Sequence, residues 1–135
     1  MGVIMLRISA VYFLIGTLMG VMIHALPMLR VVHPHWNLLG WVSFSIAGLV
    51  YTVFPAAGKS KLGIFHFWLT VIGMPLLFIG LFLSGIGLPA EPYAPIGGLL
   101  IIIGALLFTI NVFKHVKLAG FYPSHHESFQ NHIQK

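Results

Sequence analysis

Hydrophobic residues dominate the chain in four long stretches, and prolines and charged residues gather in the short segments between them. Each stretch has about 18 residues or more, the length that a helix needs to cross roughly 30 Å of hydrocarbon. The stretches cover approximately residues 8–29, 36–54, 62–88 and 96–113. This pattern predicts an all-α membrane protein with four transmembrane helices.

Composition agrees with this prediction, because 59% of the 135 residues are hydrophobic and only 7% are charged. The connecting segments are short, so we expect one four-helix transmembrane domain over residues 1–119 and a polar, histidine-containing tail over residues 120–135. The first stretch is long and lacks a small-residue cleavage site, so we interpret it as a retained span rather than a signal peptide.

The basic residues are distributed unevenly between the two sides of the predicted membrane domain. One side carries the amino terminus, the loop after the second span and the tail, and Arg30 alone lies on the other side. The first side holds Arg7, Lys59, Lys61, Lys114, Lys117 and Lys135. Positive charge collects on the cytoplasmic side, so we expect both termini in the cytoplasm and a multi-pass protein of the plasma membrane. The basic character then reflects topology and does not indicate nucleic-acid binding.

Histidine is the unusual residue of this chain, which has eight histidines but only two acidic residues. An imidazole in or near hydrocarbon is costly unless something binds it, so it marks a candidate functional site. Imidazole binds iron, copper and zinc. Because the chain has no cysteine, a metal site would have to be built from histidine.

Three histidines are predicted to lie in one layer near the outer membrane surface. His24 is expected in the outer third of the first span, and His33 and His35 at the outer start of the second. The others are expected to be structural or solvated: His66 in an aromatic belt with Phe67 and Trp68, His115 as an interfacial anchor, and His125, His126 and His132 in the tail.

The spacing of His33 and His35 limits what they can bind together. Residues two apart on a helix point about 200° away from each other, so the pair cannot easily hold one ion from the same helix. They can serve two sites on opposite flanks, or one can be a ligand and the other a supporting group. Pro34 is favoured at the first helical position, which would place His33 at the cap and leave His35 as the safer ligand. The alternative is that both are interfacial residues at a helix start.

Two motifs of the chain resemble haem–copper oxidase subunit I. The run from Val31-Val32-His33-Pro34-His35-Trp36 to Phe54-Pro55 is similar to the tenth helix of that subunit, which also carries His-x-His followed by an aromatic residue and ends at Phe-Pro. Residues 61–73 are similar to its eleventh helix, and residues 83–93 follow its Leu-Gly-Leu-x-Gly-x-Pro turn. The resemblance covers about residues 10–115.

The resemblance implies a stand-alone equivalent of the last four of the twelve oxidase helices, arranged as a four-helix arc. In that family the two histidines bind different haems, and His33 matches the high-spin ligand and His35 the low-spin axial ligand. We therefore expect haem b as cofactor, with iron ligands His35 and His33 and with His24 as a further cofactor-binding candidate. The helices that carry the copper ligands are absent, and Ala90-Glu91 replaces the usual arginine pair, so oxygen reduction is not expected.

The resemblance also bears on oligomeric state. The twelve oxidase helices form three arcs around a pseudo-threefold axis, so a four-helix chain could rebuild that shape as a homotrimer. Small residues permit close helix approach, either between subunits or within one. The candidates are Gly16 and Gly20 in the first span, Gly73 and Gly80 in the third, and Gly97, Gly98 and Gly104 in the fourth.

Two classes of function follow. One is a haem b protein that transfers electrons, with a redox partner, or binds O2 or NO. The alternative is a haem-free membrane scaffold, an assembly factor or a copper-handling protein that uses His24, His33 and His35. No base, nucleophile or redox residue stands out beyond the histidines, so no catalytic residue is assigned.

Overall fold

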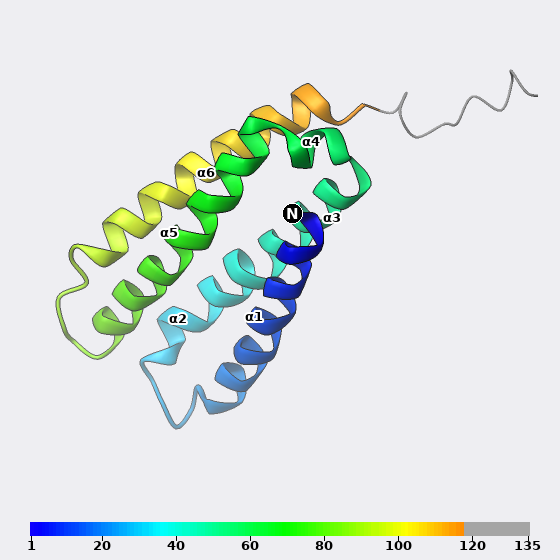
Figure 1. The fold of residues 1–135 in the computed structure, drawn as a ribbon. Helices are drawn as coiled ribbons and strands as arrows, with labels where there is room; N and C mark the ends of the chain where they lie inside the picture. Colours follow the sequence, from blue (N-terminus) through cyan, green and yellow to red (C-terminus); the bar gives the residue numbers. More distant parts are fainter. Residues whose placement is uncertain (118–135) are drawn as a thin grey trace, which may run out of the picture.

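The computed structural model describes residues 1–117, and this part of the chain is helical without any strand. The first span is α1 (Gly2–Met22). The second is one continuous helix of three segments, α2 (Leu29–His35), η1 (Trp36–Ser43) and α3 (Phe44–Val53). The short α4 (Pro55–Lys59) leads to α5 (Lys61–Gly85) and α6 (Tyr93–His115) (Figure 1). The predicted tail, with His125, His126 and His132, lies outside the described residues.

Four helices are long and apolar enough to cross a membrane: Gly2–Met22, Leu29–Val53, Lys61–Gly85 and Tyr93–His115. Large apolar side chains cover their outer faces, with Phe113 86% and Val21 79% exposed. Such a surface suits lipid and not water. The prediction of an all-α, multi-pass membrane protein is therefore confirmed. The side of the membrane that each terminus faces stays a prediction.

The helix boundaries correct two sequence-based placements. The helix α1 ends at Met22, so His24 lies in the following turn and not within the first span. The second span begins at Leu29, before Pro34, so His33 and His35 lie inside a helix instead of at its start. Arg30 lies between the first two predicted stretches, yet it is part of the helix, because a long basic side chain in the first turn can extend to the membrane surface while its backbone stays helical.

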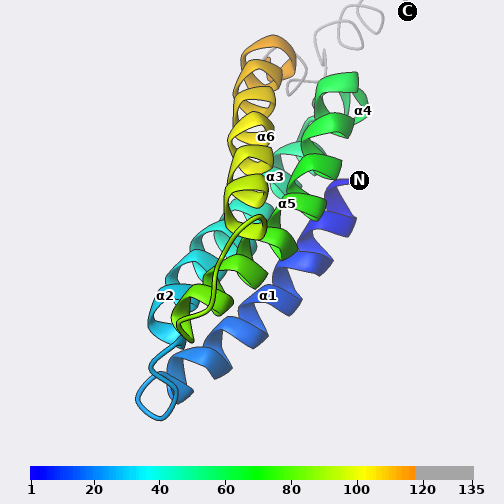
Figure 2. The same ribbon diagram turned by 90° about the vertical axis from the view of Figure 1, so that its left-hand side faces the viewer.

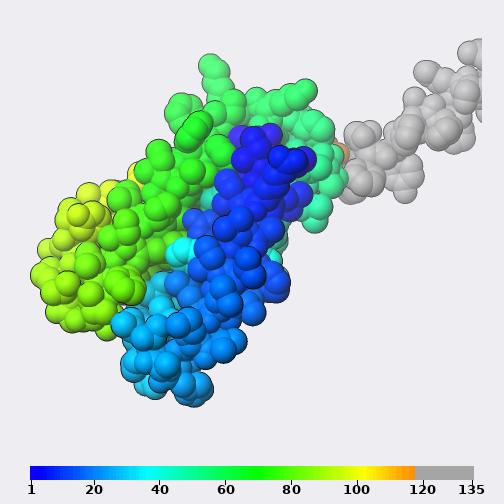
Figure 3. All heavy atoms as spheres, turned by 60° about the horizontal axis from the view of Figure 1, so that its bottom comes forward, coloured from blue at the N-terminus to red at the C-terminus, as the bar shows by residue number. Residues whose placement is uncertain are grey.

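Each span packs mainly on its neighbour in sequence. The helix α1 packs on η1 and α3, α2 packs on α5, and α5 packs along α6 (Figures 1 and 2). The backbone of α6 lies mostly apart from those of α1 and α3, and α6 meets α3 through the side chains of Asn111 and Phe108. In the space-filling view, α1 covers much of the second span, parts of which show beside it (Figure 3). The chain thus consists of two helical hairpins, joined at one end by α4. We call that end the α4 end, and the opposite end the histidine end.

Glycines form the closest helix contacts within the chain. Gly73 and Gly97 face each other across α5 and α6, and Gly80 lies against the backbone of Ala94. On α1, Gly16 leaves room for the Asn37 side chain of η1. These small residues therefore serve packing within one subunit, one of the two roles that the sequence left open. Gly98 differs, since a Cβ there would meet nothing within 4 Å.

An aromatic cluster fixes the middle of the molecule. The Trp36 indole Nε1 donates a hydrogen bond to the Tyr12 carbonyl oxygen at 2.9 Å, which ties the second span to α1. The Tyr12 ring lies 4.9 Å from Trp36, and the Trp36 ring lies 4.4 Å from Phe78 of α5. Phe44 completes the cluster, and Gly40 gives the Tyr12 ring its space. Three of the four spans meet here.

The adjacent glycines of α6 provide a matched test of this packing. In Gly97→Ala the new Cβ would lie 2.7 Å from the Gly73 carbonyl oxygen, so α5 and α6 must separate, and we expect a loss of about 1–3 kcal/mol in unfolding free energy. The control Gly98→Ala meets open space and should be neutral or stabilising by up to about 1 kcal/mol. Unfolding in mixed detergent micelles measures both variants. Equal losses would contradict the packing described.

Candidate functional site

The hydrogen bond of His35 determines which of its ring nitrogens can bind a metal. His35 is exposed on α2, and its Nδ1 lies 2.9 Å from the Val31 carbonyl oxygen, one helical turn earlier. A carbonyl oxygen only accepts, so Nδ1 carries the proton and Nε2 keeps its lone pair. Histidines that bind metals commonly donate their second ring N–H to such a carbonyl. His35 is therefore held in the form that can ligate iron.

His33 lies on a different side of the same helix. Its half-buried ring packs against α1, where a Cβ on Gly20 would come within 3.0 Å of His33 Cε1. The Asn37 amide nitrogen lies 3.2 Å from His33 Nδ1 and also donates to the His33 carbonyl oxygen at 3.3 Å. His33 and His35 thus have different surroundings, as expected for residues two apart on a helix, which point in nearly opposite directions. His33 is engaged inside the chain, and His35 faces outward.

His24 does not join the other two in a metal cluster. It is exposed in the turn after α1. Within residues 1–117, no group of three or more His, Cys, Asp or Glu side chains could hold a metal ion. A site that draws all its ligands from His24, His33 and His35 of one chain is therefore absent from this range. A haem needs only one or two histidines, so this result leaves haem ligation by His35 as a prediction.

His66 was misplaced by sequence reasoning. It is only 6% exposed and does not belong to a surface belt; Phe65 and Trp68 take the outer positions on α5 instead. The Tyr51 hydroxyl of α3 lies 2.9 Å from His66 Nδ1. The spacing of small and polar residues on α5 could have revealed that His66 is buried. These residues recur every three or four positions and form the buried face of α5: Gly63, His66, Thr70 and Gly73.

Asn111 is the centre of the polar network that holds Tyr51. The Asn111 side chain is fully buried, and its amide nitrogen donates to the Ala57 carbonyl oxygen at 3.0 Å and lies 3.4 Å from the Tyr51 hydroxyl. The Ser60 hydroxyl lies 2.8 Å from both the Asn111 amide oxygen and the Ala57 carbonyl oxygen, so its one proton is shared between these two acceptors. The Ser60 oxygen in turn accepts from the Gly63 N–H. The network joins α3, α4, α5 and α6 at the α4 end.

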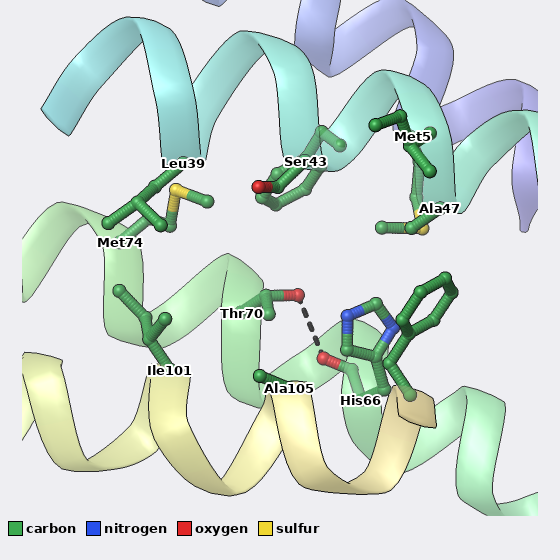
Figure 4. A pocket seen from close by; sticks show the side chains of 12 residues that line it. Met5, Leu39, Ser43, Ala47, His66, Thr70, Met74, Ile101 and Ala105 are labelled. Carbon is green, nitrogen blue, oxygen red and sulfur yellow. Dashed lines mark hydrogen bonds between the residues drawn. The ribbon is translucent and has the colours of Figure 1, made fainter. Parts of the chain in front are cut away.

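A cavity of about 240 Å³ lies beside His66, between the two hairpins (Figure 4). Its walls are mostly apolar, with polar contributions from His66, Thr70 and Ser43. The Thr70 hydroxyl donates to the His66 carbonyl oxygen at 2.8 Å, and the Ser43 hydroxyl donates to the Leu38 carbonyl oxygen at 2.9 Å. Both hydroxyl protons are therefore used by the backbone.

His115 lies half-buried at the last residue of α6. Its Nδ1 is buried and has no hydrogen-bond partner among the described residues. The interfacial role that we expect for it stays a prediction.

Comparison with protein-family models, with curated proteins and with solved structures found no match. The likeness to haem–copper oxidase subunit I therefore rests on the sequence motifs.

Removing the Asn111 amide tests whether the network stabilises the fold. Asn111→Leu keeps the size of the side chain but removes the amide hydrogen bonds to the Ala57 carbonyl and from the Ser60 hydroxyl. These two groups can still bond to each other, so we expect a loss of about 1 kcal/mol in unfolding free energy. The control Thr109→Val removes a hydroxyl on the exposed side of α6 and should change stability by less than about 0.5 kcal/mol. Unfolding in detergent compares the two. An equally small effect of both would show that the network contributes little.

Proposed function

We propose that the chain is a membrane haem b protein in which His35 is an axial ligand of the iron, and which acts in electron transfer or in binding O2 or NO. The observation that carries this proposal is the hydrogen bond from His35 Nδ1 to the Val31 carbonyl oxygen, because it leaves Nε2 as an iron ligand on an exposed helix surface. When bound, haem b supplies an iron that changes oxidation state or binds a gas at an open axial position.

The depth of His35 supports a covered site. It lies six residues after Leu29, the start of a 25-residue span, and therefore about 9 Å along the helix. An exposed imidazole at this depth meets lipid, which offers it no hydrogen-bond partner, unless another molecule covers it. A haem would cover the imidazole with a largely apolar macrocycle, and its iron would bind the free imidazole nitrogen. The donor chemistry of His35 thus fits the group.

The ligand at the second axial position of the iron would distinguish electron transfer from gas binding. A second histidine would favour electron transfer, and an open position would favour gas binding. His33 is held by Asn37 and packed on α1, so it would have to leave these contacts to bind iron. His24 is exposed in its turn and is the other candidate at the histidine end.

The proposed assembly is a homotrimer with haem near the subunit interfaces. Packing runs from each span to the next, and α1 and α6 share no extensive interface in the described part of the chain. Such a row of four helices is compatible with the arc of the resembled oxidase subunit, and three copies close around a threefold axis. A neighbouring copy would also cover His35, which is exposed in the single chain.

The proposed orientation has both termini in the cytoplasm of a cell with the protein in its plasma membrane. It is supported by Lys59 and Lys61, which are exposed at the α4 end, and by Arg30 at the histidine end.

Replacing His35 tests the ligand directly. His35→Ala should lose most bound haem while the protein still inserts into membranes, because the helix does not depend on this exposed side chain. The matched control His115→Ala, at the other end of the molecule, should keep its haem. Haem content per protein is measured from the Soret band and a pyridine haemochrome. Normal haem content in His35→Ala would contradict the assignment, and a colourless wild-type protein would favour the haem-free alternative.

The same spectra identify the second ligand. If His33 or His24 binds iron, its replacement by alanine converts a six-coordinate spectrum into a five-coordinate one, and carbon monoxide then binds without displacing a histidine. A six-coordinate spectrum retained in both variants would exclude these two residues. A five-coordinate wild-type protein would indicate gas binding.

Native mass spectrometry in mild detergent tests the trimer. We expect a mass of three chains with haem in the wild type, and a lower assembly state in His35→Ala if haem joins the subunits by binding only the assembled form. A haem-loaded monomer would contradict both the trimer and the interfacial site.

A further inference from the structure

We propose that the cavity beside His66 binds the ring of a membrane-soluble molecule through a carbonyl oxygen, with a quinone as the occupant. The proposal depends on which ring nitrogen of His66 carries the proton. Among the described residues, His66 Nδ1 is the only acceptor that a hydrogen-bond distance places beside the Tyr51 hydroxyl. Tyr51 therefore donates to Nδ1, and the ring proton of His66 sits on Nε2. His66 is a donor toward the cavity, the opposite of His35.

The polar network sets this direction. The Asn111 amide nitrogen is turned toward the Tyr51 hydroxyl, because the Ala57 carbonyl oxygen on the same side can only accept and so requires the amide N–H. Tyr51 thus receives a donor from one side and passes its own proton to His66 on the other. If Nδ1 carried the proton instead, the buried Tyr51 hydroxyl would lose its acceptor, which is costly in a low-dielectric interior.

The His66 Nε2–H is the uncommitted donor of the cavity. His66 lines the cavity, and Figure 4 shows one of its ring nitrogens turned toward the Thr70 side of the space. The hydroxyls of Thr70 and Ser43 donate to backbone carbonyls. The remaining walls are apolar, including the buried side chains of Met5 and Met74. One N–H in such a wall selects an apolar molecule that carries a hydrogen-bond acceptor.

Size and access favour a ring with an apolar tail. A dry cavity of roughly 150 Å³ holds one benzene ring, so about 240 Å³ has room for a substituted ring. Ile46 of α3 lines the cavity and is 53% exposed, and Ala105 of α6 lines it and is exposed as well. These two exposed lining residues place the edge of the cavity at the lipid-facing surface. A tail can therefore remain in lipid.

The depth of the cavity favours a quinone over a phospholipid ester, which presents the same carbonyl chemistry. The cavity extends from His66, five residues into α5, to Met74, thirteen residues into this 25-residue helix. At 1.5 Å per residue the His66 donor lies about 8 Å from the start of the span, and the cavity continues inward to Met74 at about 20 Å, so its occupant needs a ring that fills the apolar part beyond the carbonyl. The ester carbonyls of phospholipids stay near the headgroups, whereas a quinone ring moves through the hydrocarbon. Binding at this cavity does not require haem at His35.

Binding of decylubiquinone to the purified protein in nanodiscs tests the proposal, with decylbenzene as the probe that keeps ring and tail but lacks carbonyls. We expect saturable quinone binding in the wild type and in His35→Ala, which separates this test from the haem proposal. His66→Leu should weaken quinone binding about fivefold, the value of one hydrogen bond, and leave decylbenzene binding unchanged. Tyr51→Phe should weaken quinone binding less, since it frees the tautomer and keeps the ring.

A second pair of variants keeps the test independent of the polar network. Ala105→Leu narrows the cavity and should weaken both probes, whereas Ala10→Leu, exposed on α1, should change neither. Quinone binding that survives both His66→Leu and Ala105→Leu would overturn the site. Three other results would also contradict the proposal. Equal binding of the two probes to the wild type would show an apolar cavity only, and displacement of the quinone by excess phospholipid would favour a lipid ester. Cu(I) binding that is lost in His66→Leu would show a lone pair, and not a proton, at Nε2.

Discussion

Hydrocarbon offers no hydrogen-bond partner, so each polar side chain within the spans of this chain has to find one in the protein. The chain meets this constraint mostly with its own backbone: Thr17, Thr52, Thr70 and Thr109 return their hydroxyl protons to carbonyls one turn earlier. Asn111 cannot be satisfied this way, because an amide has several donor and acceptor sites, and it therefore joins α4, α5 and α6. That one buried amide is therefore the side chain through which the two hairpins are hydrogen-bonded at the α4 end.

The same constraint gives two histidines opposite chemistry. His35 donates to a carbonyl oxygen and keeps an Nε2 lone pair, whereas His66 accepts from Tyr51 and keeps an Nε2–H. A lone pair on an exposed helix surface suits a metal, and an N–H in an apolar cavity suits a carbonyl. The local hydrogen bond thus determines which kind of ligand each histidine can take. His33, held by Asn37 against α1, contributes to packing in the single chain.

The sequence was sufficient for the number and type of spans, because stretches of about 18 apolar residues are already specific for membrane helices. The sequence was less informative where residues typical of helix ends lie within a helix that packing stabilises. Arg30 and Pro34 resemble a break, yet the helix runs through both, and a π-helical segment follows at Trp36–Ser43. Such wide turns are rare and occur mostly as short bulges inside α-helices, which no hydrophobic pattern marks. The buried position of His66 follows from residue spacing on α5, but its partner Tyr51 is fifteen residues away in the chain, and no local pattern encodes that contact.

Local hydrogen bonds hold His35 and His66 in opposite tautomers, and NMR can observe this directly. The most direct measurement is a long-range correlation of ring nitrogens with ring carbon-bound protons, on haem-free protein with 15N-labelled histidine, at alkaline pH. We expect a protonated Nδ1 for His35 and a protonated Nε2 for His66, with each signal assigned by its loss in His35→Ala and His66→Leu. The same tautomer at both residues, or the reverse pair, would contradict it.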